Sequence, residues 1–216
     1  MHVIYGGTFD PIHHGHLRLA LEVCDALSVA TIDLVPCHIP PHRGDTGADS
    51  QQRLDLLQLA IAGEPALRVD DRELRRAGAS YTADTLRQLR EELGPDEPLA
   101  MVVGTDAFAA FDRWREWQAI PELAHIVVVR RSGADLPSGS EAQKLVKSRR
   151  ADDHQALHEQ PCGLVLELDP PLLDISATGI RQRIADGRSP RYLTPDSVWH
   201  SIRAQGLYGV CTRSKV

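Results

Sequence analysis

The sequence has few cysteines, few aromatic residues and no long apolar run. Its cysteines, Cys24, Cys37, Cys162 and Cys211, form neither a CxxC pair nor a dense framework, which is typical of reduced thiols in a cytoplasm. No apolar stretch approaches the roughly 20 residues that a membrane-spanning helix needs. The opening residues, MHVIYGGTFD, lack the basic stretch and apolar core of a signal peptide. We therefore expect a cytoplasmic protein with no membrane partner.

The chain also lacks an excess of positive charge. Its formal net charge is −6 at pH 7, whereas a nucleic-acid-binding protein usually carries a basic surface. We therefore expect no nucleic-acid partner. A polyanionic ligand would have to be small and would have to be bound by local positive groups. The candidate clusters are His13, His14, His16 and Arg18; His42 and Arg43; Arg130 and Arg131; and Arg181 and Arg183.

What the sequence does have is an alternation of apolar strands and amphipathic helices. The predicted strands are 2–5, 31–36, 66–70, 99–103, 125–129 and 163–168. The predicted helices are 15–27, 51–62, 83–93, 177–186 and 195–205, with a further helical stretch after 104–106 and Thr82 as the N-cap of the third helix. Strands 99–103 and 125–129 are almost entirely apolar, as in strands buried on both faces of a parallel sheet. The alternation predicts an α/β fold with a Rossmann-like, open, mainly parallel sheet and helices on both faces.

We expect a single domain over residues 1–210. Within it, the polar segment 132–160 predicts an exposed excursion with one short helix, and 187–210 predicts a small C-terminal helical part. Residues 211–216 would form a polar tail. Open parallel sheets bind ligands beyond the carboxyl ends of their strands, where the strand order reverses. The positive clusters follow predicted strands, so they should gather at that edge.

Residues 6–16, GGTFDPIHHGH, place two glycines at the end of the first strand and three histidines at the start of the next helix. Three interpretations compete: a metal site, an anion-binding turn, and a turn whose histidines face water. A zinc site needs three or four nitrogen or sulfur ligands, and no nearby Cys or Glu completes a set with His13 and His16. Glycines let a phosphate approach the backbone, and a helix start offers unpaired N–H groups. The anion-binding turn therefore explains the most residues.

The same segment resembles the N-terminal signature of the nucleotidyltransferase superfamily that is related in fold to class I aminoacyl-tRNA synthetases. The second signature of that superfamily, I-S-x-T-x-I-R, is matched by ISATGIR at 175–181. Further segments resemble the bacterial nicotinate-mononucleotide adenylyltransferases: PPHR (40–43), SYTADTL (80–86), GTDAFAAFDRWREW (104–117) and YLTPDSVWHSI (192–202). The resemblance covers nearly the whole chain and is weakest at 132–160. Departures from the usual residues of the family are Tyr5, Arg43 and Thr105.

The resemblance implies adenylyl transfer from ATP to nicotinate mononucleotide, which gives deamido-NAD and pyrophosphate in NAD biosynthesis. Such an in-line displacement at phosphorus needs alignment and charge neutralisation rather than a nucleophilic side chain. The alternatives are an adenylyltransferase for another phosphate acceptor, such as nicotinamide mononucleotide or phosphopantetheine, and a non-catalytic ATP-binding sensor. We expect Mg²⁺ to be bound through phosphates, because no carboxylate cluster suggests a protein cage. A homodimer is compatible with the sequence.

The resemblance also implies site residues. His13 and His16 would hold triphosphate oxygens as catalytic residues, with His16 at the α-phosphate, whereas His14 would point away. The implied ATP site is Gly7, Thr8, Phe9, His13, His16, Gly104, Asp106, Ser176, Thr178 and Arg181, with Asp106 on the ribose hydroxyls. The implied mononucleotide site is His42, Arg43, Tyr81, Thr82, Trp114 and Arg115.

Three of these residues have purely structural alternatives. Trp114 would stack on the pyridine ring, with Trp117 nearer the packing surface, but an aromatic residue in a helical stretch more often packs in a core. Asp106 and Ser176 would be ordinary helix N-caps if they bound no ligand. Arg130 and Arg131 receive no role.

Overall fold

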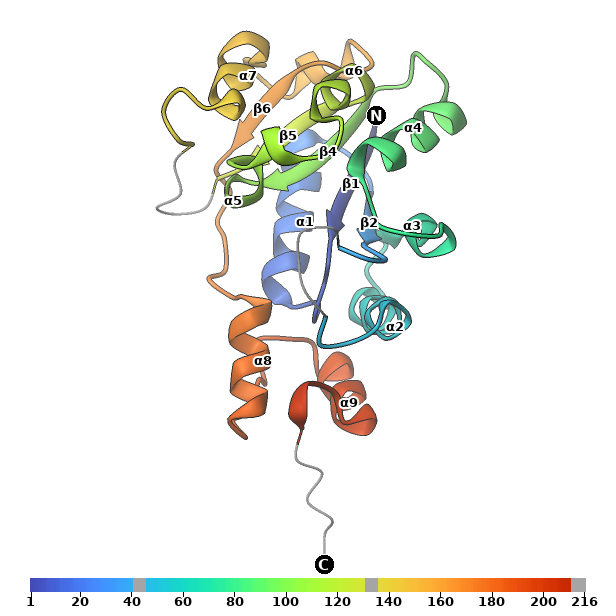
Figure 1. The fold of residues 1–216 in the computed structure, drawn as a ribbon, viewed down its shortest axis with the longest axis vertical. Coiled ribbons are helices and arrows are strands. Elements are labelled where there is room, and N and C mark those ends of the chain that lie inside the picture. The colour runs from blue at the N-terminus through green and yellow to red at the C-terminus, as the bar shows by residue number, and fades with distance from the viewer. Residues whose placement is uncertain (41–45, 131–135, 211–216) are drawn as a thin grey trace, which may run out of the picture.

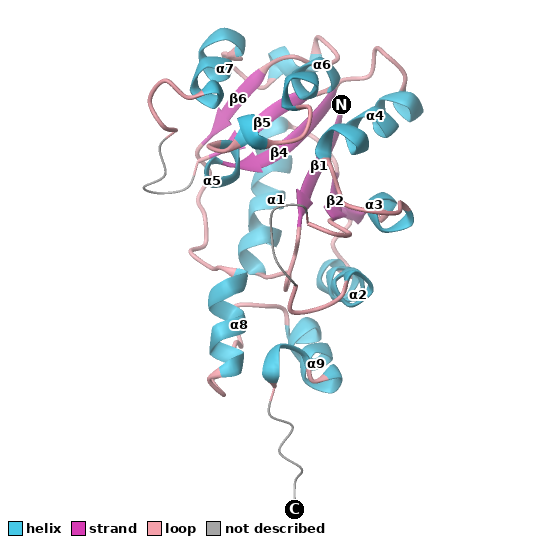
Figure 2. Ribbon diagram, viewed as in Figure 1, coloured by secondary structure: helices cyan, strands magenta, loops and turns pink. Residues whose placement is uncertain are grey.

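The computed structural model of the protein describes residues 1–40, 46–130 and 136–210. Within these residues the chain forms one six-stranded sheet with the order β3-β2-β1-β4-β5-β6, and every pair of neighbouring strands is parallel (Figures 1 and 2). The strands are β1 (His2–Gly7), β2 (Ile32–Pro36), β3 (Leu67–Val69), β4 (Leu99–Gly104), β5 (His125–Val129) and β6 (Val165–Leu168). The strand order reverses between β1 and β4. The predicted open, parallel sheet is confirmed.

The connections between strands are mostly helical. The α-helices are α1 (His14–Leu27), α2 (Ser50–Ile61), α3 (Arg72–Arg75), α4 (Thr82–Leu93), α5 (Thr105–Phe108), α6 (Ile120–Leu123), α7 (Glu141–Arg149), α8 (Ala177–Ala185) and α9 (Asp196–Gln205). The 3₁₀ helices are η1 (Phe111–Arg113), η2 (Trp117–Ala119), η3 (Gln155–His158) and η4 (Leu207–Gly209). The predicted helices are all present. The single-turn helices α3 and α6 were not predicted, because four residues carry too little periodicity to indicate a helix.

Side chains alternate between two apolar layers, one on each face of the sheet. On β1, Val3 and Tyr5 belong to the layer that includes residues of α1, α2, α8 and α9, whereas Ile4 belongs to the layer with α4, α6 and α7. Every residue of β5 is at most 1% exposed, since helices cover this strand on both sides. The prediction of helices on both faces is therefore confirmed, and the double covering explains the uninterrupted apolar run of β5.

The segment 132–160 is not the wholly exposed excursion that its polarity predicts. In its described part, α7 is the expected short helix, and Ala142 and Val146 of this helix are buried in the layer beside α4 and α6. Leu157 of η3 is buried in the opposite layer. Leu145 packs against the same layer, so the apolar positions of α7 cover little more than one turn and do not stand out among the lysines and arginines.

The C-terminal part of the chain packs beyond the end of the sheet. Helices α8 and α9 lie together at one end of the molecule, next to the start of α1 (Figure 1), and Ile180, Ile184, Val198 and Ile202 join the layer of α1. This arrangement brings the second signature segment, 175–181, toward the first. No helix in the described part of the chain is long and apolar enough to cross a membrane.

His125 is the first residue of β5 and lies at the edge of the sheet where the strands begin. Its titratable ring is buried there. Its Nε2 lies 2.9 Å from the carbonyl oxygen of Gln160, and its Nδ1 accepts a hydrogen bond from the backbone N–H of Leu164 at 3.1 Å. Both bonds form only when the ring is neutral and carries its proton on Nε2. Burial lowers the pKa of His125 below its usual 6.5.

We therefore expect the free energy of unfolding to fall as the pH decreases below about 6.5, because the unfolded chain then binds a proton that the folded His125 does not. A His125→Gln variant, which keeps an amide donor but cannot titrate, should lose less stability between pH 7.5 and 5.5. The control is His200→Gln, which removes an exposed histidine of α9 and should keep the pH dependence of the unmodified protein. Urea unfolding at both pH values measures the difference, and an unaltered pH dependence in His125→Gln would contradict the assignment.

Candidate functional site

The sequence-predicted site residues of β1 and β4 lie beside the point where the strand order reverses. Tyr5 pairs with Val102, so Gly7 and Gly104 stand two residues further along neighbouring strands. A Cβ at Gly7 would come within 2.7 Å of the Phe9 ring, whereas no described atom lies within 4 Å of the Cβ position of Gly6. Glycine at position 7 is needed for packing. Glycine at position 6 leaves open space through which a ligand can approach the backbone.

The two outer histidines of the first signature are held against each other. His13 is the N-cap of α1 and only 2% exposed, and its ring stacks on that of His16 with centroids 3.7 Å apart. The Phe9 ring packs edge-on against His16 at 5.2 Å. A Cβ at Gly15 would lie 3.0 Å from Nδ1 of His13, so this glycine makes room for the ring. A turn with water-facing histidines does not describe His13.

Ser176 and its neighbours lie next to this histidine pair although they come much later in the chain. The Cβ position of Gly15 is 3.4 Å from the carbonyl oxygen of Ile175. Ser176 caps α8 by accepting a hydrogen bond from the N–H of Gly179 at 3.1 Å, and Thr178 Oγ1 lies 3.3 Å from Arg181 Nη2. Neither α1 nor α8 has an acidic residue in its first turn. The positive dipole ends of two helices therefore lie close together, an arrangement that favours an anion.

The end of β4 contributes Gly104 and Asp106 to the same edge of the sheet. Gly104 is the N-cap of α5, and Asp106 is exposed in its first turn. Between them, Thr105 is buried and donates a hydrogen bond from Oγ1 to the carbonyl oxygen of Val129 at 3.0 Å. This departure from the usual family residue ties β4 to β5 and leaves Asp106 on the outer side of the turn.

Three residues predicted for the mononucleotide site come together at the start of α4. Tyr81 is the N-cap, so the expectation that Thr82 caps this helix is wrong, and Thr82 is its first residue. The guanidinium carbon of Arg115 lies 4.6 Å from the centroid of the Tyr81 ring. Arg115 also pairs with Asp84 at 3.8 Å. The ring quadrupole attracts a cation over its face, which favours this position of Arg115 beside Tyr81.

Trp114 and Trp117 differ less in burial and packing than the sequence suggests. Both are half-buried and pack on Phe111, with ring centroids 5.4 Å and 5.9 Å from it. Trp117 is thus not set apart as the packing residue of the pair. Trp114 still presents part of its ring outside the core, on the segment that also carries Arg115.

His42 and Arg43 lie outside the described residues. The described residues just before them contact the start of α4: the N–H of His38 donates to Ser80 Oγ at 2.9 Å, and the N–H of Ser80 donates to the carbonyl oxygen of Ile39 at 3.0 Å. The end of β2 is therefore connected to the residue that precedes Tyr81.

Two buried charged side chains that hold the first signature segment in place were not identified from the sequence. Arg53 of α2 is fully buried and donates to the carbonyl oxygens of Thr8 at 2.7 Å and His38 at 2.8 Å; burial lowers the pKa of its guanidinium from the usual range. Asp10 is 5% exposed, and hydrogen-bond donors from three other segments surround it. The available signals were an arginine next to the apolar face of helix 51–62 and an aspartate inside GGTFDPIHHGH.

Among the residues that the structure describes, no group of three or more His, Cys, Asp or Glu side chains is placed to hold a metal ion. The anion-binding interpretation of the histidine segment uses the same residues without such a group.

Comparison with known proteins shows the family of the chain. The profile of the cytidylyltransferase-like family matches residues 4–183, a span that contains every site residue predicted from the sequence. A probable nicotinate-nucleotide adenylyltransferase of Marinobacter nauticus is 74% identical over 209 residues, which cover 97% of each chain. One of Cellvibrio japonicus is 50% identical over 205 residues, covering 95% of this chain and 97% of the other.

Solved structures share the fold. The nicotinic acid mononucleotide adenylyltransferase of Plasmodium falciparum, complexed with NaAD, aligns with a TM-score of 0.72 at 18% identity over 95% of this chain and 96% of its own. At that identity the likeness concerns the fold alone, and the sequence relatives carry the assignment. The chain therefore belongs to the cytidylyltransferase-like family and, within it, to the nicotinate-nucleotide adenylyltransferases.

Proposed function

We propose that the chain catalyses adenylyl transfer from ATP to nicotinate mononucleotide, which yields deamido-NAD and pyrophosphate in NAD biosynthesis. The observation that carries this proposal is the meeting of two signature segments, at Gly15 and Ile175, beside the point where the strand order reverses. The near-full-length similarity to nicotinate-nucleotide adenylyltransferases supports the choice of substrates.

The reaction is an in-line displacement. A phosphate oxygen of the mononucleotide bonds to the α-phosphorus of ATP, the bond from that phosphorus to the bridging oxygen of the β-phosphate breaks, and pyrophosphate leaves with the electron pair. Negative charge grows on the α-phosphate and on the leaving group. Imidazole N–H groups of His13 and His16 and the backbone N–H groups at the starts of α1 and α8 neutralise it. Their fixed stacking means that the histidines need little reorganisation.

ATP binding in this proposal uses both helix starts and the end of β4. Gly7, Thr8 and Phe9 line the triphosphate path, Ser176 and Thr178 donate from the start of α8, and Asp106 beyond Gly104 accepts from the ribose hydroxyls. Arg181 uses Nη1 and Nη2 within the protein, on Asp10 and Thr178. A guanidinium has five N–H donors, so it keeps donors for phosphate.

Mononucleotide binding in this proposal uses the start of α4 and the segment after η1. Trp114 stacks on the pyridine ring, while Tyr81, Thr82 and Arg115 lie around it, and His42 and Arg43 contact its phosphate. The interaction of Arg115 with Tyr81 keeps these two side chains together, which supports a shared role.

We further propose that Mg²⁺ accompanies ATP and is held by phosphate oxygens and water. When bound, the ion neutralises charge on the departing pyrophosphate. A cytoplasmic location and a homodimer complete the proposal, with ATP and nicotinate mononucleotide as the small-molecule partners and no nucleic acid.

The choice of acceptor can be tested directly. With ATP and Mg²⁺, pyrophosphate release should be faster with nicotinate mononucleotide than with nicotinamide mononucleotide or phosphopantetheine, because backbone donors satisfy a carboxylate better than a neutral amide. Initial rates with the three acceptors measure the preference. Faster turnover with the amide would refute nicotinate as the substrate, and ATP binding without turnover on any acceptor would favour a sensor.

Replacement of His16 by alanine should lower kcat by roughly 10²–10³, by analogy with the loss of one transition-state donor. The dissociation constant for ATP should increase less, because the other triphosphate donors remain. His14→Ala, at the neighbouring position, is the control and should leave kcat nearly unchanged. Steady-state kinetics with calorimetric ATP titration separate the two effects, and an equal loss in binding and turnover would contradict a role at the transition state.

Replacement of Trp114 by alanine should weaken nicotinate mononucleotide binding by about 1–2 kcal/mol, since a stacked ring is lost. Trp117→Ala is a matched control, because Trp117 packs on the same Phe111 ring and its loss removes similar core packing. Titration of each variant with the mononucleotide, together with thermal unfolding, distinguishes stacking from packing. If the two variants bind equally well, Trp114 does not belong to the site.

A further inference from the structure

Asp10 connects the first signature to two segments far away in the sequence. Its Oδ2 accepts a hydrogen bond from the N–H of Gly47 at 2.9 Å. Its Oδ1 accepts from the N–H of Ala48 at 3.2 Å and from the Tyr208 hydroxyl at 2.8 Å. A buried carboxylate is stable only when such donors surround it. Asp10 is therefore not placed to bind a negatively charged ligand itself, and its role must act through its neighbours.

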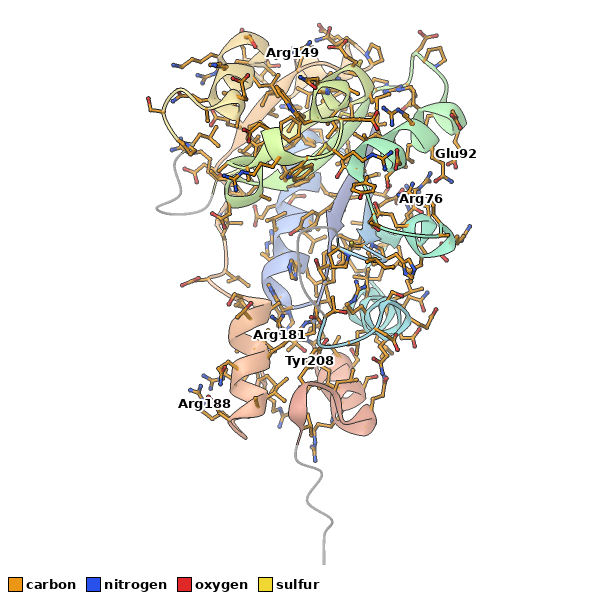
Figure 3. The ribbon with its side chains drawn as sticks, viewed as in Figure 1. Arg76, Glu92, Arg149, Arg181, Arg188 and Tyr208 are labelled. Atoms are coloured by element: carbon orange, nitrogen blue, oxygen red, sulfur yellow. The ribbon has the colours of Figure 1, made fainter. Side chains whose placement is uncertain are left out.

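One of those neighbours is Arg181. Its Nη1 donates to the backbone carbonyl oxygen of Asp10 at 2.6 Å and lies 3.7 Å from Oδ2 of the same residue. Arg181 and Tyr208 lie beside each other where the C-terminal helices meet the rest of the molecule (Figure 3). The signature arginine, the signature aspartate and the C-terminal tyrosine thus form one cluster.

Gly47 packs closely against the tyrosine and the arginine of this cluster. A Cβ at this position would lie 2.7 Å from two ring carbons of Tyr208 and 3.2 Å from Cδ of Arg181. The glycine backbone is packed directly against the tyrosine ring and the aliphatic stem of the arginine. Because Asp10 fixes Gly47 and Tyr208 by hydrogen bonds, it also limits where the Arg181 stem can lie.

Tyr208 is held in an unfavourable backbone conformation. Its φ is +59°, in the left-handed region that a bulky side chain rarely adopts. Such a conformation persists when the surroundings determine it, and it is often associated with a functional role. Burial and the neighbouring Asp10 raise the pKa of Tyr208, so its hydroxyl keeps the proton that it donates.

We propose that Asp10 is a positioning residue that, through Gly47 and Tyr208, fixes Arg181 for the triphosphate. The inference rests on the proposed function, in which Arg181 contacts ATP. An arginine side chain has many rotamers, and fixing it before the ligand arrives reduces the entropy lost on binding. The C-terminal turn at 207–209 is then part of the ATP site, whereas the mononucleotide side, at Tyr81 and Trp114, should be independent of it.

The test is Tyr208→Phe, which removes one hydroxyl and keeps the ring. The dissociation constant for ATP, measured by calorimetry without acceptor, should rise on the order of tenfold, and the KM for ATP should rise with it. The KM for nicotinate mononucleotide and the kcat should change less than twofold. Tyr192→Phe is the matched control, because Tyr192 is 82% exposed and its hydroxyl should not matter.

A double-mutant cycle identifies the route of the effect. In an Arg181→Met background, which keeps an aliphatic stem, Tyr208→Phe should cause no further loss of ATP affinity. If Tyr208→Phe fails to fold, Gly47→Ala takes its place. This substitution displaces the tyrosine ring and the arginine stem without removing a charge, and it should cause the same tenfold loss of ATP affinity. Unchanged ATP affinity in the folded variants, or losses that add in the cycle, would overturn the inference. A protein that binds ATP but transfers no adenylyl group would instead refute the proposed function and leave this binding test intact.

Discussion

The structure of the site depends on the approach of the α8 start to the α1 start, at Gly15 and Ile175. The positive dipole ends of both helices lie close together there, and this juxtaposition is unfavourable without negative charge nearby. Asp10 supplies a buried carboxylate at the junction, and Arg181 crosses from α8 to the Asp10 carbonyl oxygen. The start of α8 is thus connected to the first signature segment through Asp10, while the rings of His13 and His16 are positioned by stacking on each other and by Phe9.

The sheet determines which residues can meet there. From the central strand β1 the chain continues to β2 and β3 on one side, and it then crosses to β4 on the other side of β1. The carboxyl ends of β1 and β4 therefore lie next to each other, between the two sets of helices. This is the position at which open parallel sheets bind ligands. Arg53 then adds a second constraint, since its buried guanidinium holds the carbonyl groups of Thr8 and His38 together. The first signature segment and the residues that follow β2 are thereby linked below the surface.

The sequence predicted the strands, the longer helices and both signature segments, because apolar periodicity and glycine–histidine spacing are local signals. It did not predict the burial of α7, whose apolar positions cover little more than one turn. It also missed the partners of Asp10, since a hydrogen bond between residues 10 and 208 depends on tertiary packing that no local pattern encodes. Thr82 was misassigned as an N-cap because side-chain preference favours threonine there, whereas in the structure the helix begins one residue earlier, after Tyr81.

The position of Tyr208 has a consequence for the order in which the molecule forms during synthesis. All six strands of the described sheet precede it in the chain, so the two apolar layers can begin to assemble while the ribosome still holds the last helix. Asp10, made among the first residues, receives its hydroxyl partner only when η4 emerges. A nascent chain that has its sheet but not yet this turn therefore lacks one hydrogen bond to Asp10, so the loop after β1 is completed only at the end of synthesis.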